Sequence, residues 1–376
     1  MTSDVFFMDL EATSRENLPD KLSRLVKTAG LEPVLKENDL TAVKVHFGEQ
    51  GNTAYIRPVF IRKIIQAVRE FKARPFLTDA NTLYVGTRSN SVSHIHTAIE
   101  NGFSYSSMDA TPIIIADGLL GKNETTIKVN QKNCRQVYLG SEIVEADALV
   151  SVAHFKGHEL SGFGGTLKNL GMGCASRRGK LDQHSNVSPK IKRKTCIGCG
   201  ECARHCPGDA IYLEEKKAYI RAEACIGCAE CIVRCPTGSV TINWNQTVPV
   251  FLEKMMEYCL GVLKNKKNKA FFINFITDIS PGCDCLSYNA SPIVNNVGVL
   301  ASLDPVAIDQ ASADLVNQQK GLSNTELKGN LNPGEDKFKG LYPSVDWQHQ
   351  LSYAETIGLG TRDYTLIPLK TLKYKA

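Results

Sequence analysis

The sequence predicts an α/β protein in which a parallel sheet is covered by helices and a small cysteine-rich domain is inserted into the chain. Short apolar, β-branched runs alternate with helical patterns before the cysteines, and the alternation resumes after them. Alternation of this kind places successive strands in one parallel sheet, so we expect both flanks to belong to a single domain. The alternative is three separate domains in a row.

The expected elements follow from hydrophobic periodicity and from turn residues. Before the cysteines, we expect strands at 42–47, 75–80, 112–116 and 148–154, and helices at 58–71, 91–101 and 141–146. After the cysteines, we expect a helix at 248–264, strands at 270–276 and 297–300, and a helix that opens with Asp304 and Pro305. Asp at the N-cap and Pro at the first helical position are a start signal. The discontinuous α/β domain would comprise residues 1–187 and 246–376, and the insertion residues 188–245.

The insertion carries two runs of the pattern C-x2-C-x2-C-x3-C-P. Their cysteines are Cys196, Cys199, Cys202 and Cys206, followed by Cys225, Cys228, Cys231 and Cys235. This spacing is typical of a bacterial-type ferredoxin with two [4Fe–4S] clusters, in which the fourth cysteine of each run binds the other cluster. We therefore expect Cys235 to complete the first cluster site and Cys206 the second. Zinc knuckles or a disulfide framework are the alternatives, but zinc requires no proline after its last ligand.

Composition indicates the compartment and argues against several partners. In an oxidising space the 13 cysteines would be expected to pair, whereas most of them have cluster spacing, so we expect the cytoplasm of an anaerobe. Neither a signal peptide nor a membrane span is indicated. The net charge of +5 is mild, and the basic runs 190–194 and 264–269 are short, so nucleic-acid binding is not expected. These runs are solvated faces or a docking patch for an acidic electron carrier.

Polar residues gather where the expected strands end, which is where ligand sites form in open α/β sheets. These residues are His46, Asp79, Asn81, Asp117, His154 and Asp278. One histidine at a strand end is more often structural than functional. Side chains at five strand ends on one rim favour a shared site.

The loop 154–174 is the densest of these strand-end segments. Glycines at 162, 164, 165, 171 and 173 would let backbone N–H groups approach an anion or cofactor, and Lys156 and Lys168 would supply charge. Gly157, between His154 and His158, favours a loop over a metal-binding helix. We expect catalytic roles for His46, His154, His158 and Lys168, and cofactor contacts from Gly162, Gly164, Gly165 and Asn169. The alternative is a plain glycine-rich connector.

A Cys-x-Cys pair, Cys283 and Cys285, follows the insertion. Its two thiols lie close enough in sequence to share a metal, to pair with a cluster or to act as a redox couple. Cys174 and a histidine could complete such a metal site. Two inert buried thiols are the alternative, and Cys134 and Cys259 are expected in the core.

The order of these motifs resembles a known family over nearly the whole chain. The segment 44–49, the loop 154–174, the cysteine-rich insert, Cys283-Asp-Cys285 and the segment 303–307 together resemble the "domain of unknown function 362" family of iron–sulfur proteins. The resemblance implies an iron–sulfur protein, described at most as an oxidoreductase, and it implies no substrate.

A shorter pattern, His158-x3-Gly162-Phe163-x-Gly165-x2-Lys168, is similar to a loop of the nickel-pincer lactate racemases. That similarity would make His158 an acid/base and Lys168 the cofactor anchor. Racemases need no ferredoxin, however, so we take the similarity as support for a shared α/β scaffold with a site in this loop.

Two functions of different class follow from these observations. In the first, the clusters pass single electrons to a small anionic substrate or a metal, in a pocket where the loop 154–174 meets Cys283 and Cys285 beside the insertion. In the second, the chain is an electron carrier that serves a partner enzyme. A redox partner protein or a low-potential carrier is expected in both. The sequence shows neither G-x-G-x-x-G after a strand nor G-x4-G-K-[ST], so no nucleotide cofactor is indicated.

Overall fold

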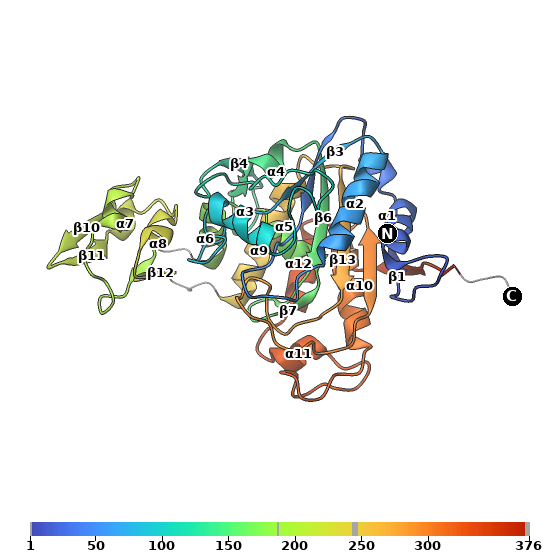
Figure 1. Cartoon of the computed structure of the whole chain (residues 1–376). Coiled ribbons are helices and arrows are strands. Elements are labelled where there is room, and N and C mark those ends of the chain that lie inside the picture. The colour runs from blue at the N-terminus through green and yellow to red at the C-terminus, as the bar shows by residue number, and fades with distance from the viewer. Residues whose placement is uncertain (1, 186–187, 243–246, 373–376) are drawn as a thin grey trace.

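The structure is a computed structural model that describes residues 2–185, 188–242 and 247–372 (Figure 1). Its centre is a seven-stranded sheet with the strand order β15-β1-β14-β13-β6-β2-β3. The bounds of these strands are β1 Ser3–Met8, β2 Leu40–Lys44, β3 Arg74–Thr78, β6 Ala148–His154, β13 Ala270–Ile276, β14 Gly298–Ser302 and β15 Tyr364–Pro368.

The sheet is mainly parallel, which confirms the expected α/β class. Strands β3, β2, β6 and β13 are parallel neighbours, and β15 is parallel to β1, whereas β14 runs antiparallel between β13 and β1. The reversal has a local cause. Residues 277–297 contain no helix, so the chain does not cross back to the opposite end of the sheet. Strand β14 therefore starts near the carboxyl end of β13 and runs antiparallel to it.

Helices cover both faces of the sheet. One face carries α1 (Leu18–Thr28), α2 (Pro58–Glu70) and α3 (Ser91–Glu100), and the other carries α5 (Thr166–Gly171), α9 (Val248–Leu263), α10 (Pro305–Asn317) and α12 (Gln348–Thr356). The side chains of β13 point alternately into the apolar cores on the two faces. Phe271, Ile273 and Phe275 pack with the first group of helices, and Phe272 and Ile276 pack with the second.

Shorter elements fill the connections. They are the 3-10 turn η1 (Glu32–Val34), the hairpin β4 (Glu124–Lys128) and β5 (Gln136–Gly140), α4 (Ser141–Glu145), the hairpin β7 (Lys156–His158) and β8 (Gly162–Gly164), α6 (Arg177–His184) and α11 (Lys337–Leu341). Within the described part of the chain, every helix is too short or too polar to span a bilayer.

Residues 112–116 do not form the expected strand. Only Ile113 forms an isolated bridge, to Leu77 of β3, and the N–H of Leu77 donates to the Pro112 carbonyl at 2.9 Å. Proline has no N–H to donate, so the ladder does not extend through Pro112. Strands β1 and β15 were not expected from the sequence.

Residues 188–242, here called the cysteine-rich segment, lie to one side of the sheet domain (Figure 1). The elements of this segment are β9 (Lys190–Ile191), α7 (Glu201–Arg204), β10 (Ile211–Glu214), β11 (Lys217–Ile220), η2 (Ala222–Ala224), α8 (Glu230–Arg234) and β12 (Val240–Thr241). Strand β9 pairs with β12, so the two ends of the segment meet. Its apolar core includes Cys196, Cys202, Cys231 and Ile232, and two residues of the sheet domain, Leu83 and Leu181, join that core.

Candidate functional site

A cavity of about 360 Å³ opens at the carboxyl ends of β2, β3 and β6. It brings together residues that are far apart in sequence. Of the residues named from the sequence, those that line it are His46, Asp79, His154, Lys156, His158, Gly164, Gly165, Lys168, Asn169, Gly173, Cys283 and Cys285. Gly162, Cys174, Asn81, Asp117 and Asp278 are not among the lining residues.

The loop 154–174 builds one wall as a β-hairpin followed by α5. The hairpin packs directly on the segment after β13, because a Cβ at Gly157 would lie 2.2 Å from the Pro281 carbonyl oxygen. Helix α5 is held by Asp309, which accepts hydrogen bonds from the N–H groups of Thr166 and Leu167 at 2.8 and 2.9 Å. The first turn of α5 is thereby fixed, and with it the side chain of Lys168.

His158 is a neutral hydrogen-bond donor at this wall. Its Nδ1 accepts the backbone N–H groups of Leu160 and Ser161, each at 3.2 Å, so the ring proton resides on Nε2. Burial, and after it the charge of Lys168, hold the pKa of His158 well below its usual value. The imidazole can therefore donate from Nε2 at neutral pH, whereas its other nitrogen is occupied.

His154 is fully engaged by protein groups. Its Nδ1 lies 2.8 Å from Oδ1 of Asp284, and its Nε2 lies 2.8 Å from the Thr277 carbonyl oxygen. Both partners are hydrogen-bond acceptors, so each ring nitrogen is directed at an oxygen atom of the protein. Burial would raise the pKa of Asp284, but the charges of His154 and Lys156 outweigh burial and hold that pKa well below its usual range. His154 thus anchors the turn that carries the two thiols.

Cys283 and Cys285 face the cavity as an unequal pair. The thiol of Cys285 donates a hydrogen bond to Cys283, which lowers the pKa of Cys283 well below its usual value and raises that of Cys285. Lys168 Nζ lies 3.5 Å from Cys283 Sγ and stabilises the thiolate further. Burial alone would lower the pKa of Lys168, but the charges of both sulfur atoms raise it. The site therefore holds a thiolate, a thiol and an ammonium group in contact.

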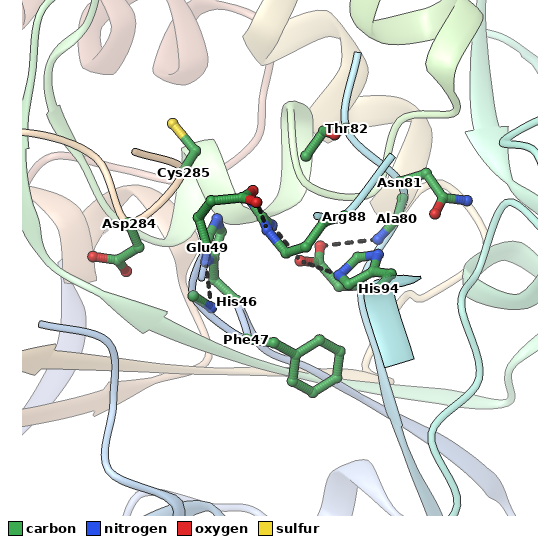
Figure 2. Close-up of polar contacts among 12 residues, drawn as sticks. His46, Phe47, Glu49, Ala80, Asn81, Thr82, Arg88, His94, Asp284 and Cys285 are labelled. Atoms are coloured by element: carbon green, nitrogen blue, oxygen red, sulfur yellow. Dashed lines mark hydrogen bonds and ion pairs between the residues drawn. The ribbon is translucent and has the colours of Figure 1, made fainter. Parts of the chain in front are cut away.

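A buried network of charges adjoins the turn that carries the two thiols, because the N–H of Glu49 donates to the Asp284 carbonyl at 3.0 Å (Figure 2). Arg88 lies 3.0 Å from Glu49 and 3.4 Å from Asp79, and Lys44 lies 2.9 Å from Asp79. In Figure 2, Asp284 and Cys285 lie on one side of Glu49 and Arg88 on the other. His46 stands beside this network, with Nδ1 accepting the N–H of Gly48 at 3.0 Å. Burial, with the charge of Arg88, lowers the pKa of His46.

The cavity is rich in positive charge. Its basic residues are Lys44, Arg88, Lys156, Lys168 and Lys180, whereas its carboxylates are Asp79 and Glu159. Burial lowers the pKa of Lys180 to about 8, so this side chain still carries a proton at neutral pH. Sequence reasoning missed Arg88, Lys180 and His184 as site residues. The i, i+4 spacing of Lys180 and His184 on α6 was an available signal.

Several glycines and one cysteine of the loop 154–174 have packing roles. A Cβ at Gly162 would lie 2.5 Å from Cβ of Trp347, and one at Gly165 would lie 2.4 Å from Oδ1 of Asp309. Cys174 is buried beneath α5, and burial raises the pKa of its thiol to about 11. Among the residues that the structure describes, no three His, Cys, Asp or Glu side chains form a group that could hold a metal ion.

In the cysteine-rich segment, thiols from the two runs meet. Cys196, Cys199 and Cys202 line one small cavity together with Cys235 of the second run. After burial, the charge of Cys206 contributes to raising the pKa of both Cys228 and Cys231, and the charge of Cys202 adds to the effect on Cys231, so cysteines of both runs lie near the second group. Backbone N–H groups also point at three sulfur atoms. The distances are 3.5 Å from Ala218 N to Cys196, 3.3 Å from Ala210 N to Cys206 and 3.1 Å from Ser239 N to Cys235.

A thin wall separates this segment from the large cavity. Leu83 lines the cavity and also belongs to the apolar core of the cysteine-rich segment. On α6, Lys180 and His184 face the cavity while Leu181 packs into that same core. Glu230, between Cys228 and Cys231, lies 3.1 Å from Lys122 and 3.8 Å from Arg177.

Solved structures with similarity to this chain include two from thermophilic bacteria. The lactate racemase apoprotein from Thermoanaerobacterium thermosaccharolyticum has 13% sequence identity and a TM-score of 0.37, and the match covers 74% of this chain and 51% of that one. A protein from Thermotoga maritima has 11% identity and a TM-score of 0.37, with 74% and 54% covered. The chain thus spans about half the length of these two proteins.

No curated protein matches the chain. A family model described as "Domain of unknown function (DUF362)" matches residues 41–314, which include the cavity, the cysteine-rich segment and the start of α10. This match covers most of the sequence. The chain therefore belongs to the family Domain of unknown function (DUF362).

Proposed function

We propose that the chain is an iron–sulfur redox protein, in which two [4Fe–4S] clusters in the cysteine-rich segment pass single electrons to a small anionic substrate in the large cavity. One observation carries the proposal. Three cysteines of the first run and the last cysteine of the second run line the same small cavity, which is the crossed arrangement that two-cluster ferredoxin spacing requires.

The surroundings of the thiols support clusters over single zinc ions. A cluster places an iron–sulfide core between its four ligands, so the thiols need not approach one another as closely as around one ion. The backbone N–H groups directed at Cys196, Cys206 and Cys235 would stabilise negative charge on cluster ligands and thereby influence the reduction potential.

The cavity has features suited to an anionic substrate. Lys168 and Lys180 can bind a carboxylate or similar group, and His158 can donate a hydrogen bond from Nε2 to an oxygen that gains charge on reduction. A neutral imidazole suits this role better than an imidazolium, because it donates a hydrogen bond without transferring its proton to the bound substrate. His154 and His46 would hold the walls in place rather than exchange protons with the substrate.

The common wall supports electron transfer between the two regions. Leu83 and α6 contact the cysteine-rich segment on one side and line the cavity on the other, so a substrate in the cavity would lie close to that segment. This arrangement favours an enzyme over a carrier, because a carrier has no need of a charged cavity behind its cluster segment.

The proposal is tested on protein purified without oxygen. We expect roughly eight irons per chain from the formula of two clusters, and a paramagnetic signal after reduction with titanium(III) citrate. Cys134→Ala and Cys259→Ala, which alter buried cysteines outside the two runs, serve as matched controls and should retain the iron. Zinc at two ions per chain, or a protein without metal, would exclude the clusters. Iron without any change in cluster oxidation rate when small carboxylates or other anions are added would favour the carrier.

A further inference from the structure

We propose that Cys283 and Cys285 are a redox-active pair between the clusters and the cavity, which holds two electrons as a dithiol and releases them by forming a reversible intramolecular disulfide. The inference rests on the proposed function for its source of electrons. It adds a chemical step and two acting residues to that function.

The local backbone places the two sulfur atoms within reach of each other. The N–H of Leu286 donates to the Cys283 carbonyl at 3.0 Å, so residues 283–286 form a turn, and the N–H of Cys285 lies 3.4 Å from Cys283 Sγ. A turn shortens the distance between residues i and i+2 relative to extended chain. Both cysteines line the same cavity, so the turn presents the two thiols on one side, where their sulfur atoms can be joined.

The surroundings suit a dithiol better than the two alternatives. A metal would need further ligands, but Cys174 does not line the cavity and both ring nitrogens of His154 are engaged by protein groups. Inert core thiols would be enclosed by apolar side chains, as Cys259 is, whereas Cys283 and Cys285 line the cavity and Cys283 contacts Lys168. Thiolate beside a cation is the reactive form of cysteine.

The connection to the cysteine-rich segment is direct. Tyr84 Oη donates to the Cys285 carbonyl oxygen at 2.8 Å, and the adjacent Leu83 belongs to the apolar core around Cys231. One short stretch of chain therefore joins the turn to the segment that would hold the clusters.

The step balances within the protein. When the pair is oxidised, the Sγ–Sγ bond forms, Cys285 loses its proton and two electrons leave, one for each oxidised cluster. In the reverse direction, the Sγ–Sγ bond breaks, Cys283 becomes a thiolate and Cys285 takes up one proton. A dithiol thus converts two single-electron steps into one two-electron step at the cavity.

The test counts electrons and identifies the bond. The holoprotein is oxidised with thionine, desalted and titrated with titanium(III) citrate without oxygen, while the cluster signal is followed in the same sample. We expect two electrons for the clusters and two more for the disulfide. Cys283→Ser and Cys285→Ser should each remove the second pair, and Cys174→Ser, the matched control, should retain it.

Mass spectrometry of the wild-type protein keeps the test decisive even if a variant fails to fold. The tryptic peptide 270–320 contains no other cysteine. Alkylation with iodoacetamide should leave this peptide unmodified and two hydrogens lighter in the oxidised protein, and doubly alkylated in the reduced protein. Two alkylated thiols in both states, with only two electrons taken up, would overturn the dithiol. If the disulfide forms in a protein that lacks clusters, the redox-active dithiol is supported but the clusters are excluded as its source of electrons.

Discussion

His154 and Asp284 form a buried pair in which Nδ1 of the ring lies 2.8 Å from Oδ1 of the carboxylate. His154 ends β6, and Asp284 separates the two thiols, so this contact joins the central sheet to the turn at the cavity. The exposed fractions are 2% for His154 and 0% for Asp284, so water does not weaken the attraction.

Asp284→Asn should destabilise the protein strongly. The change leaves His154 and Lys156 without their counter-charge in a buried place, a situation that typically costs about 3–5 kcal/mol of unfolding free energy. Urea unfolding followed by far-UV circular dichroism measures the loss. Asp278→Asn is the matched control, because its ion pair with Arg57 is long, at 3.8 Å, and exposed. Equal stability of the two variants would contradict the role of the pair.

Lys168→Gln should raise the pKa of Cys283. Lys168 lowers that pKa by its charge, so its removal shifts the pH profile of iodoacetamide alkylation of Cys283 upward and slows the reaction at neutral pH. Alkylation rates at a series of pH values, read on the peptide 270–320, give the profile. Lys168→Arg, which retains the charge, should stay close to the wild-type profile. An unchanged profile in Lys168→Gln would contradict the contribution of Lys168 to the pKa of Cys283.

Cys206→Ala should damage the cluster that is bound by Cys225, Cys228 and Cys231. The reason is the crossed arrangement of the two runs. Electron paramagnetic resonance of the reduced variant can be compared with that of Cys228→Ala and Cys199→Ala. The signal that remains in Cys206→Ala should match Cys228→Ala. A match with Cys199→Ala would mean that each run binds its own cluster.

Residues 188–245 should be removable as a unit. Strands β9 and β12 bring the two ends of the segment together, so a short Gly/Ser linker can replace it. We expect a folded, colourless α/β domain that is roughly 2–5 kcal/mol less stable, because Leu83 and Leu181 lose their apolar contacts and Arg177 loses Glu230. Size-exclusion chromatography and circular dichroism measure the outcome.

Glu230→Gln in the full chain is the control for that deletion, since it weakens the ion pairs of Glu230 to Lys122, Arg177 and Arg234 and leaves the segment in place. An insoluble deletion product whose two flanks are soluble only as separate fragments would support three domains in a row.

Mild acid should destabilise the protein through its buried histidines. Burial lowers the pKa of His46, His94, His158 and His184 in the folded state, to about 3 for His184, from the ordinary 6.5. The unfolded chain therefore binds more protons. This contribution to stability is complete above pH 6.5 and is lost as the pH falls toward the folded-state pKa values.

Urea midpoints between pH 5 and 7 measure the acid effect. Each such histidine adds up to about 1.4 kcal/mol per pH unit to the slope. His184→Gln should lower the slope by up to about 1.4 kcal/mol per pH unit, the effect of one proton. His96→Gln, at an exposed position, should leave the slope unchanged. A flat dependence of stability on pH in this range would contradict the burial of neutral rings.

The sequence predicted the inner part of the fold better than its edges. Strands β6 and β13 have the expected bounds because continuous apolar runs between turn residues are typical of buried parallel strands. Strand β1 has only the short apolar run 5–8, and of its six residues only Val5 and Met8 are buried. Its partner β15 lies at the far end of the chain, and no local pattern indicates that pairing.

The candidate site was predictable where strands end and less so elsewhere. The strand-end rule located His46, Asp79 and His154 at one cavity. Arg88 and Lys180 reach the cavity from a loop and from α6, through tertiary packing that sequence spacing does not specify. The chemical role of a side chain in the site also depends on its hydrogen-bond partners. His154 was expected to be catalytic, yet the partners of both its nitrogens could be identified only from the structure.

The pairing of β13 with β6 has a consequence for how the chain is made. Strand β6 lies between β2, which is synthesised earlier, and β13, which the ribosome completes only after residues 155–269. At about 5–20 residues per second, one edge of β6 waits on the order of ten seconds for its neighbour. An apolar strand with a free edge is a template for incorrect pairing. We therefore expect nascent chains that stall within the cysteine-rich segment to aggregate through β6.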